Sequence, residues 1–156
     1  MSSTEAAALD DARLNEVGDF YLACYNEYFT GNKSFDETFG SIVADDIVFS
    51  ENMKEKVGLV AFKEYYETAW KPAFAGYEAQ VIQRFRPFGT NILSFSIIAL
   101  ADLHIDCQTG MSPQTHTLHF NDDGKIVRME HLYALSPWTL KALGKLQEMA
   151  AASGGK

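Results

Sequence analysis

Two histidines, His116 and His131, occupy the two arms of a predicted β-hairpin, HTLHFNDDGKIVRMEHLY. Gly124 follows Asp123 in the connecting turn, where glycine can adopt the left-handed backbone that a tight hairpin loop needs. Imidazole changes its protonation state near neutral pH and can act as an acid or a base. Because side chains alternate along a strand, each histidine shares a face with apolar neighbours. These neighbours are Leu118 and Phe120 in the first arm and Val127, Met129 and Tyr133 in the second. The hairpin is therefore a candidate wall of a pocket with polar groups in it.

Other chemistry receives less support from the sequence. No pair of histidines and acids has helical i, i+4 or similar ligand spacing, so no metal site is predicted. Asp102 and His104 share a strand face, where they could add a polar contact or face solvent. Each histidine could also be a structural residue with satisfied hydrogen bonds. Two cysteines, Cys24 and Cys107, are expected to be free thiols.

The remaining chain supplies the elements that would position this hairpin. Apolar residues at three- and four-residue steps predict a helix from about residue 14 to 28. Ser34 and Glu37 form a capping box that opens a short helix to about residue 41. A strand is expected at 45–51, a helix from Gly58 to Pro72, strands at 77–85 and 91–106, and a last helix after Ser136-Pro137.

Helices segregated from a run of four consecutive strands indicate an α+β protein. We expect a curved antiparallel sheet that forms a half-open cone around the N-terminal helices. The length of 156 residues predicts one domain. Its core would span about residues 10–135, and the extra C-terminal helix, with Trp138, Leu140, Leu143 and Leu146, about 137–150.

Two segments resemble the NTF2-like superfamily, which includes ketosteroid isomerases, SnoaL-like polyketide cyclases and scytalone dehydratase. ADDIVFSENMKEKVGLVAFKEYYETAW is similar to the family's strand, loop, glycine and helix, and HFNDDGKIVRMEHLY to its terminal hairpin. The resemblance covers about residues 10–135. It implies the cone-shaped fold, but not one reaction, because this fold carries many chemistries and also proteins without catalysis.

The resemblance also implies roles for individual residues. Glu51 matches the position of the ketosteroid isomerase base, and Tyr25 matches the tyrosine of the oxyanion hole. His116 takes the place of that site's second donor, a protonated aspartate. Because two of these residue types differ from the steroid isomerases, the site is closer in kind to SnoaL-like cyclases and to fungal isomerases of this fold. Met129, His131 and Tyr133 would line the substrate pocket.

These residues could perform acid–base chemistry without a cofactor. A buried carboxylate gains proton affinity and can remove a proton from a carbon next to a carbonyl group. Tyr25 and His116 could then donate hydrogen bonds to the developing enolate oxygen. Alternatively, His116 could share a proton with Glu51. We therefore expect an isomerase or cyclase, or a dehydratase, that acts on an apolar, carbonyl-bearing polyketide or terpenoid intermediate of secondary metabolism. The alternative is a ligand-binding or dimerisation module that has the same fold and no catalysis.

Charge and hydropathy limit the choice of partners. The net charge is −8 and no basic run occurs, which argues against nucleic acid and anionic membranes. No apolar run could cross a bilayer, and the acidic N-terminus is unlike a signal peptide, so we expect a cytoplasmic protein. The strand from Asn91 is apolar on both faces, which predicts cover on both faces and hence a homodimer.

Overall fold

The structure is a computed structural model that describes residues 9–87, 89–103 and 109–134, together with Pro137, Leu140, Lys141, Gly144, Gln147, Glu148, Ala151 and Ala152. The elements are α1 (Asp11–Phe29), α2 (Phe39–Ile42), β1 (Val43–Glu51), β2 (Lys54–Val57), α3 (Leu59–Tyr65), the π-helical turn η1 (Tyr66–Trp70), α4 (Lys71–Ala73), β3 (Phe74–Phe85), β4 (Ile92–Leu103), β5 (Thr109–Phe120) and β6 (Ile126–Tyr133).

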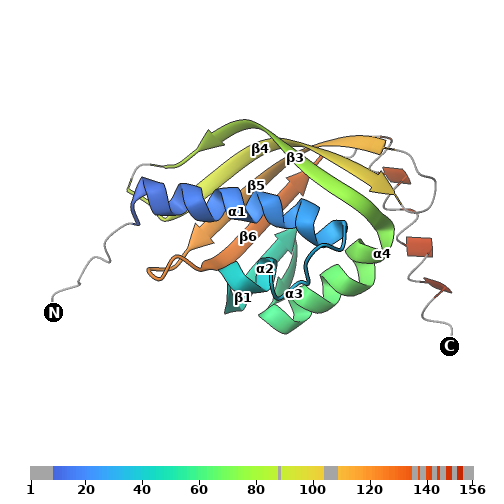
Figure 1. Cartoon of the computed structure of the whole chain (residues 1–156), viewed down its shortest axis with the longest axis horizontal. Helices are drawn as coiled ribbons and strands as arrows, with labels where there is room; N and C mark the ends of the chain where they lie inside the picture. Colours follow the sequence, from blue (N-terminus) through green and yellow to red (C-terminus); the bar gives the residue numbers. More distant parts are fainter. Residues whose placement is uncertain are drawn as a thin grey trace.

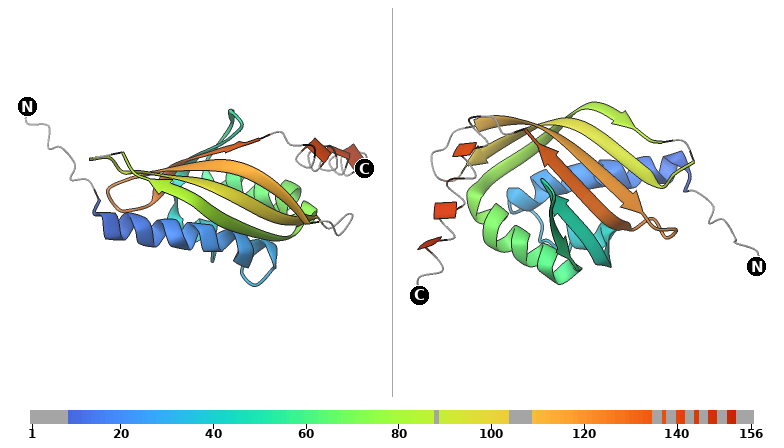
Figure 2. Two further views of the ribbon diagram at one scale, coloured as in Figure 1. Left: turned by 90° about the horizontal axis from the view of Figure 1, so that it is seen from above. Right: turned by 180° about the vertical axis from the view of Figure 1, so that it is seen from behind.

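One curved, open sheet has the strand order β2-β1-β6-β5-β4-β3. Helix α1 and the shorter helices α2 to α4 lie on the same face of this sheet (Figures 1 and 2). The α+β class and the cone-like arrangement expected from the sequence are confirmed. The sheet is mixed, however, because β1 pairs with β6 in parallel, whereas the other pairings are antiparallel.

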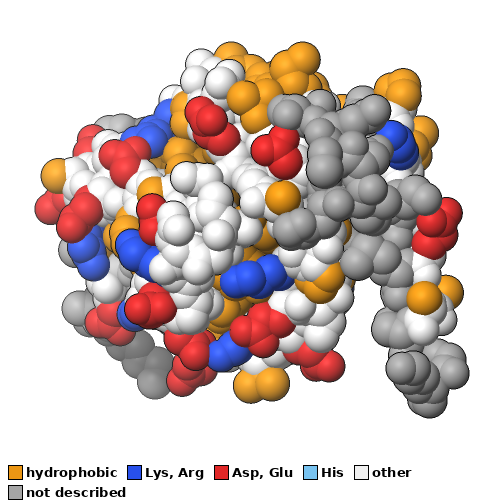
Figure 3. Space-filling model, turned by 45° about the vertical axis from the view of Figure 1, so that its right-hand side comes forward, with side chains coloured by type: hydrophobic (Ala, Val, Ile, Leu, Met, Phe, Trp, Pro, Cys, Tyr) orange, Lys and Arg blue, Asp and Glu red, His pale blue; other side chains and the backbone are white. Residues whose placement is uncertain are grey.

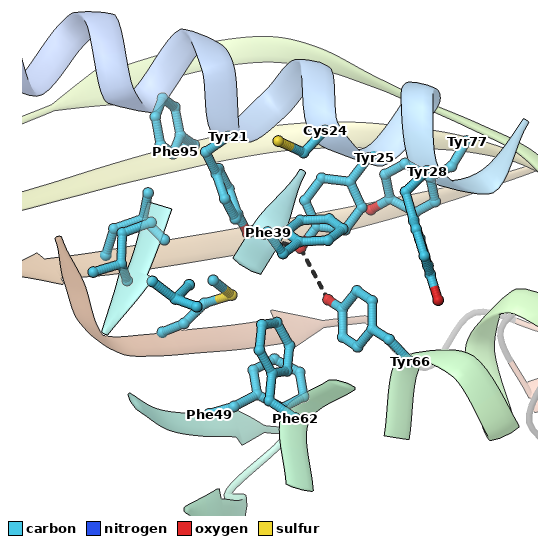
Figure 4. Packing of buried hydrophobic residues seen from close by; sticks show 14 of the residues in the cluster. Tyr21, Cys24, Tyr25, Tyr28, Phe39, Phe49, Phe62, Tyr66, Tyr77 and Phe95 are labelled. Carbon is cyan, nitrogen blue, oxygen red and sulfur yellow. Dashed lines mark hydrogen bonds between the residues drawn. The ribbon is translucent and has the colours of Figure 1, made fainter. Parts of the chain in front are cut away.

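Helix α1 forms where the sequence places its apolar stripe. The side chain of Asp10 caps it by accepting a hydrogen bond from the Arg13 backbone N–H at 2.7 Å. Its buried face consists of Leu14, Val17, Gly18, Tyr21, Cys24, Tyr25, Tyr28 and Phe29. The C-terminal half of this face is mostly aromatic, and its rings pack against those of Phe39, Tyr66 and Tyr77 (Figure 4).

The terminal hairpin has the predicted turn, in which Gly124 adopts a φ of 76°. His116, Leu118 and Phe120 share the buried face of β5, as expected. On β6 the expected alternation holds from Met129 onward. It fails near the turn because the register shifts there, so that the fully buried Ile126, rather than Val127, faces the core.

Two further segments differ from the expectation. The Ser34–Glu37 capping box forms, with the Ser34 hydroxyl donating to Glu37 at 2.7 Å, but residues 35–38 are turns and helix α2 begins only at Phe39. Strand β2 was not expected. It pairs with β1 through a two-residue turn at Asn52 and Met53, whose φ values of 43° and 67° suit a type I′ hairpin.

The last predicted helix is helical at the positions that the structure describes between 137 and 152, and Leu140 is exposed there. Trp138, Leu143 and Leu146 of that prediction, like His104 and Cys107, lie outside the described residues. No helix of the described part is long and apolar enough to span a membrane.

Candidate functional site

The polar side chains of the site come from one transverse row of the sheet. His131 on β6 pairs in register with Glu51 on β1, and on its other side with His116 on β5. This row continues to Phe95 on β4. All four residues lie on the face covered by the helices and are at least nine-tenths buried. His131 therefore lies between Glu51 and His116, which were expected to face each other directly.

A cavity opens at the Glu51 end of this row and is walled largely by aromatic rings. Its volume is about 20 Å³, enough for one water molecule. Its lining is formed by Tyr25, Phe29, Glu51, Tyr66, Trp70, Tyr77, Gln114, His131 and Tyr133. Four of the six residues expected in the site thus meet at this cavity. The other two, His116 and Met129, are buried outside its wall.

Glu51 is a buried carboxyl group whose exposed fraction is 8%. Burial raises its pKa from 4.5 to about 7, although the hydrogen bond from Tyr65 and the charges of Lys56 and Lys54 act in the opposite direction. The Tyr65 hydroxyl donates to Glu51 Oε2, and the Lys56 ammonium lies 3.8 Å from the centre of the Tyr65 ring. A carboxyl with this pKa exchanges protons near neutral pH, as a general base must.

The two histidines are stacked and neutral. Their ring centroids are 3.9 Å apart and their planes differ by 15°. Burial lowers the pKa of His116 to about 3, and burial together with the neighbouring His116 lowers the pKa of His131 well below 6.5. Two charged imidazolium rings could not stack in this enclosed place, so both rings hold one proton each near neutral pH.

The hydroxyl of Tyr21 connects both histidines to helix α1. It lies 2.7 Å from His116 Nδ1, 2.7 Å from His131 Nε2 and 2.8 Å from the Tyr25 hydroxyl. The Tyr25 hydroxyl is in turn 3.1 Å from His131 Nε2. It is also 3.2 Å from the Tyr66 hydroxyl, which lies opposite it in Figure 4. Tyr25, the expected oxyanion donor, therefore already has partners inside the protein.

Tyr133 differs from Tyr25 in this respect. It lines the cavity, and no hydrogen bond of its hydroxyl occurs among the residues that the structure describes. Burial and the nearby Glu51 carboxylate raise the pKa of Tyr133, so the phenol keeps its proton. It can therefore donate a hydrogen bond to a group placed in the cavity.

Several residues of the site were not recognised from the sequence. Tyr21 and Tyr66 belonged to apolar helical stripes, while Tyr65, Trp70, Tyr77 and Gln114 were not considered as site residues. Gln114 carried one usable indication, since it lies two residues before His116 and therefore on the same face of the strand. No feature of the sequence indicated the π-helical turn that carries Tyr66 and Trp70, although such turns are frequent at functional sites. In the described part of the chain, no group of three or more histidine, cysteine and acidic side chains is arranged to hold a metal ion.

Comparison with known proteins gives similarity in structure without close similarity in sequence. No protein-family model matches the sequence, and no curated protein sequence matches it significantly. The structure is similar to a candidate polyketide cyclase from Xanthomonas campestris pv. campestris, with a TM-score of 0.70, 16% identity, and coverage of 84% of this chain and 97% of that one.

Two further solved structures are similar to this one. An NTF2-like protein of unknown function from Exiguobacterium sp. 255-15 matches with a TM-score of 0.65 and 20% identity, over 76% of this chain and 98% of that one. PrhC from Penicillium brasilianum NBRC 6234 matches with a TM-score of 0.67 and 10% identity, over 92% and 91%. Identities this low establish the fold alone. The chain therefore has the fold of the NTF2-like superfamily, in agreement with the resemblance of its two sequence segments.

Proposed function

We propose that this protein is a cofactor-independent acid–base enzyme that acts on an apolar small molecule with a carbonyl group, as an isomerase or cyclase of the polyketide or terpenoid type. The observation that carries the proposal is Glu51, a buried carboxyl group with a pKa of about 7 in the wall of an aromatic cavity. A carboxylate in such a place can remove a proton from a carbon next to a carbonyl group.

In this mechanism the substrate carbonyl receives a hydrogen bond from Tyr133 while Glu51 takes the proton. The electrons of the broken C–H bond move to the carbonyl oxygen, and the Tyr133 hydroxyl stabilises the enolate charge. Glu51 then returns its proton to another carbon in an isomerisation. In a cyclisation the enolate carbon attacks a second carbonyl carbon, and Glu51 gives its proton to the oxygen of that carbonyl. His116, which was expected to donate to the enolate oxygen or to share a proton with Glu51, and His131, which was expected to line the pocket, both stay neutral in this mechanism.

The cavity admits one water molecule, so an organic substrate binds only after part of the wall moves. Trp70 is a suitable part. Its indole Nε1 is enclosed and makes no well-formed hydrogen bond among the described residues, although the Tyr65 hydroxyl lies beside it. Enclosing a donor without a partner costs about 1–3 kcal/mol. An outward movement of Trp70 would satisfy this donor with water and enlarge the cavity at the same time.

Proton removal is tested with an unconjugated cyclic enone as a probe in D₂O. Wild-type protein should catalyse deuterium uptake next to the carbonyl and conversion to the conjugated enone. Glu51→Gln keeps the shape of the side chain but cannot accept the proton, and its rate should fall at least about 100-fold. Tyr133→Phe should lose about 100-fold as well. Asp122→Asn, in the exposed hairpin turn, serves as the control. A Glu51→Gln variant with wild-type exchange would disprove the proposal.

Assembly is a second and separate proposal. The sheet face opposite α1 carries exposed apolar side chains, among them Ile82, Met111 and Leu132, and a groove of about 650 Å³. Figure 3 shows charged side chains of both signs scattered over the molecule and a hydrophobic area at its upper edge. We propose that two copies pair through this face. Sedimentation should give a dimer at micromolar protein, and Leu132→Glu should give a monomer. A wild-type monomer would disprove the pairing and leave the non-catalytic dimerisation module without support.

A further inference from the structure

A chain of hydrogen bonds leads from the cavity wall into the core and back. It starts at Gln114 Oε1, which lies 2.8 Å from the Tyr77 hydroxyl and 2.8 Å from His116 Nε2. From His116 Nδ1 it continues over 2.7 Å to the Tyr21 hydroxyl, and from there over 2.7 Å to His131 Nε2. The ring of His131 then forms part of the cavity wall.

The chemistry of each group determines which way these hydrogen bonds run. An amide oxygen can only accept, so Tyr77 and His116 Nε2–H both donate to Gln114. A neutral imidazole has a single N–H, so His116 Nδ1 carries a lone pair. Tyr21 must therefore donate its only proton to His116 Nδ1.

The next step fixes the proton of His131. Because the proton of Tyr21 is used, its oxygen can only accept from its two other neighbours, Tyr25 and His131 Nε2. His131 is then protonated on Nε2, and its second nitrogen, Nδ1, carries the lone pair. No hydrogen bond to this Nδ1 occurs in the part of the chain that the structure describes, so the nitrogen is available as an acceptor.

We propose that Gln114 and Tyr21 are positioning residues that set the tautomer of His131, the register partner of Glu51, and make its Nδ1 a hydrogen-bond acceptor. Tyr21 does not line the cavity and acts through His131. Gln114 is three hydrogen bonds away from His131 along the chain Gln114–His116–Tyr21–His131. The inference rests on the proposed function only in assigning a use to this acceptor, which is to accept a hydrogen bond from a substrate hydroxyl while the ring stays neutral.

Reversing the Gln114 amide would reverse every step. With its nitrogen toward His116, Gln114 would donate to Nε2, His116 Nδ1–H would donate to Tyr21, and Tyr21 would donate to His131 Nε2. His131 would then carry its proton on Nδ1, and this nitrogen would be a hydrogen-bond donor instead of an acceptor. The direction of one amide group thus decides whether His131 accepts or donates, without any change of net charge.

Nitrogen NMR of the imidazole rings tests the proposal, because the chemical shifts of Nδ1 and Nε2 distinguish the two neutral tautomers. In the wild-type protein at neutral pH, both His116 and His131 should carry the proton on Nε2. Finding the proton on Nδ1 of His131, or finding either ring charged, would overturn the proposal before any substitution is made.

Two variants then test the positioning role. Gln114→Met keeps the length of the side chain but removes the acceptor for His116 Nε2–H. The proton of His116 should then move to Nδ1 and be donated to Tyr21. Tyr21 would in turn donate to His131 Nε2, so that the proton of His131 also moves to Nδ1. Both rings should move toward the Nδ1–H form, against the intrinsic preference of imidazole. Tyr21→Phe should break the connection, so that His131 no longer responds when Gln114→Met is added. Unchanged tautomers in Gln114→Met would contradict the role of Gln114.

The matched control is Thr115→Val, because Thr115 neighbours Gln114 on β5 but faces away from the helices. It should leave both tautomers as in the wild type. These spectra require no substrate, so the inference and the proposed function can fail separately. The predicted tautomers combined with full exchange activity in Glu51→Gln would refute Glu51 as the base and support the positioning network.

Discussion

Two neighbouring rows of side chains on the same face of the sheet differ completely in chemistry. The first, here called the apolar row, runs through Leu93, Leu118, Met129 and Phe49, which are paired in register. The second, the polar row, lies two residues away from the first on each of the same four strands. It runs through Phe95, His116, His131 and Glu51. Members of both rows are buried.

The comparison shows what the fold does not require. The apolar row demonstrates that these strands and α1 can be joined by hydrophobic contact alone, which is the cheapest way to fill such a layer. The polar row buries two histidines and a carboxyl group at the same depth, and each of them needs a partner to offset its desolvation. Tyr21, Tyr65 and Gln114 supply these partners. An arrangement that costs stability in this way is typical of functional sites.

The largest expected effect comes from breaking the apolar row. Leu118 is fully buried between Leu93 and Met129, so Leu118→Ala removes contacts and leaves a cavity. The free energy of unfolding should fall by about 2–5 kcal/mol, measured by urea denaturation. Leu118→Met conserves volume and should cost less than about 1.5 kcal/mol. A loss below about 1 kcal/mol for Leu118→Ala would show that the row is not tightly packed.

The polar row should affect stability in a way that depends on pH. Since burial raises the pKa of Glu51 from 4.5 to about 7, folding favours its protonated form. The group imposes no penalty below pH 4.5; the folded protein loses stability as the pH rises from 4.5 to about 7, and above that the loss is complete. Glu51→Gln does not ionise. Its stability relative to wild type should therefore be about 3 kcal/mol more favourable at pH 8 than at pH 4.

Thermal unfolding of both proteins across this pH range measures the difference. The amide introduced by Glu51→Gln also changes the hydrogen bond from Tyr65, but that contribution is the same at every pH and cancels in the comparison. Parallel stability curves for the two proteins would mean that Glu51 titrates normally. Such a result would remove the main support for its role as a base.

Strand alternation predicted much of the polar row, because alternation is a local property of the chain. It placed His116 on the buried face of β5 and Met129, His131 and Tyr133 together on β6, and the family resemblance added Glu51. Neighbours across strands were harder to predict. The parallel pairing of β1 with β6, which sets Glu51 beside His131, depends on how distant segments align, and local sequence does not encode such a register.

The hydrogen-bonding partners were harder still. Tyr21 and Tyr66 have the spacing of an ordinary aromatic helix face, and an aromatic residue on such a face usually serves the core. Only the packing of the helices against the sheet shows that these hydroxyls also belong to the hydrogen-bond network around the histidines. The fold was therefore predictable from local patterns, whereas the tyrosines that hydrogen-bond to the histidines and to Glu51 were not.

Helix α1 lies over both rows at Gly18, and a substitution there tests how closely they are covered. A Cβ at this position would come within 2.6 Å of Leu93 Cδ2, in the apolar row, and 2.9 Å of Phe95 Cζ, in the polar row. Overpacking of this kind lowers the free energy of unfolding by about 1–3 kcal/mol. The better helix propensity of alanine offsets up to about 1 kcal/mol of this loss. Gly18→Ala should therefore unfold at a lower temperature than the wild type.

The matched control is Gly144→Ala, where no atom of the described residues comes within 4 Å of the added Cβ. It should leave stability unchanged or raise it slightly. Equal melting temperatures for Gly18→Ala and the wild type would mean that Leu93 and Phe95 can yield without cost, and that the helix covers both rows loosely.

The smallest expected effect concerns the charges at the edge of the polar row. Lys56 on β2 lowers the pKa of Glu51, although less than the Tyr65 hydrogen bond does, and burial outweighs both. Lys56→Met removes this charge and should raise the pKa of Glu51 by a fraction of a unit, observed by carbon NMR of the carboxyl group. Because the attraction crosses partly solvated space, about 1 M salt should reduce the difference between variant and wild type. Lys125→Met, at the other end of the hairpin, should leave the titration unchanged. If Lys56→Met shifted the pKa of Glu51 as much as Tyr65→Phe does, the charge on the exposed strand β2 would influence Glu51 as strongly as its buried hydrogen-bond partner.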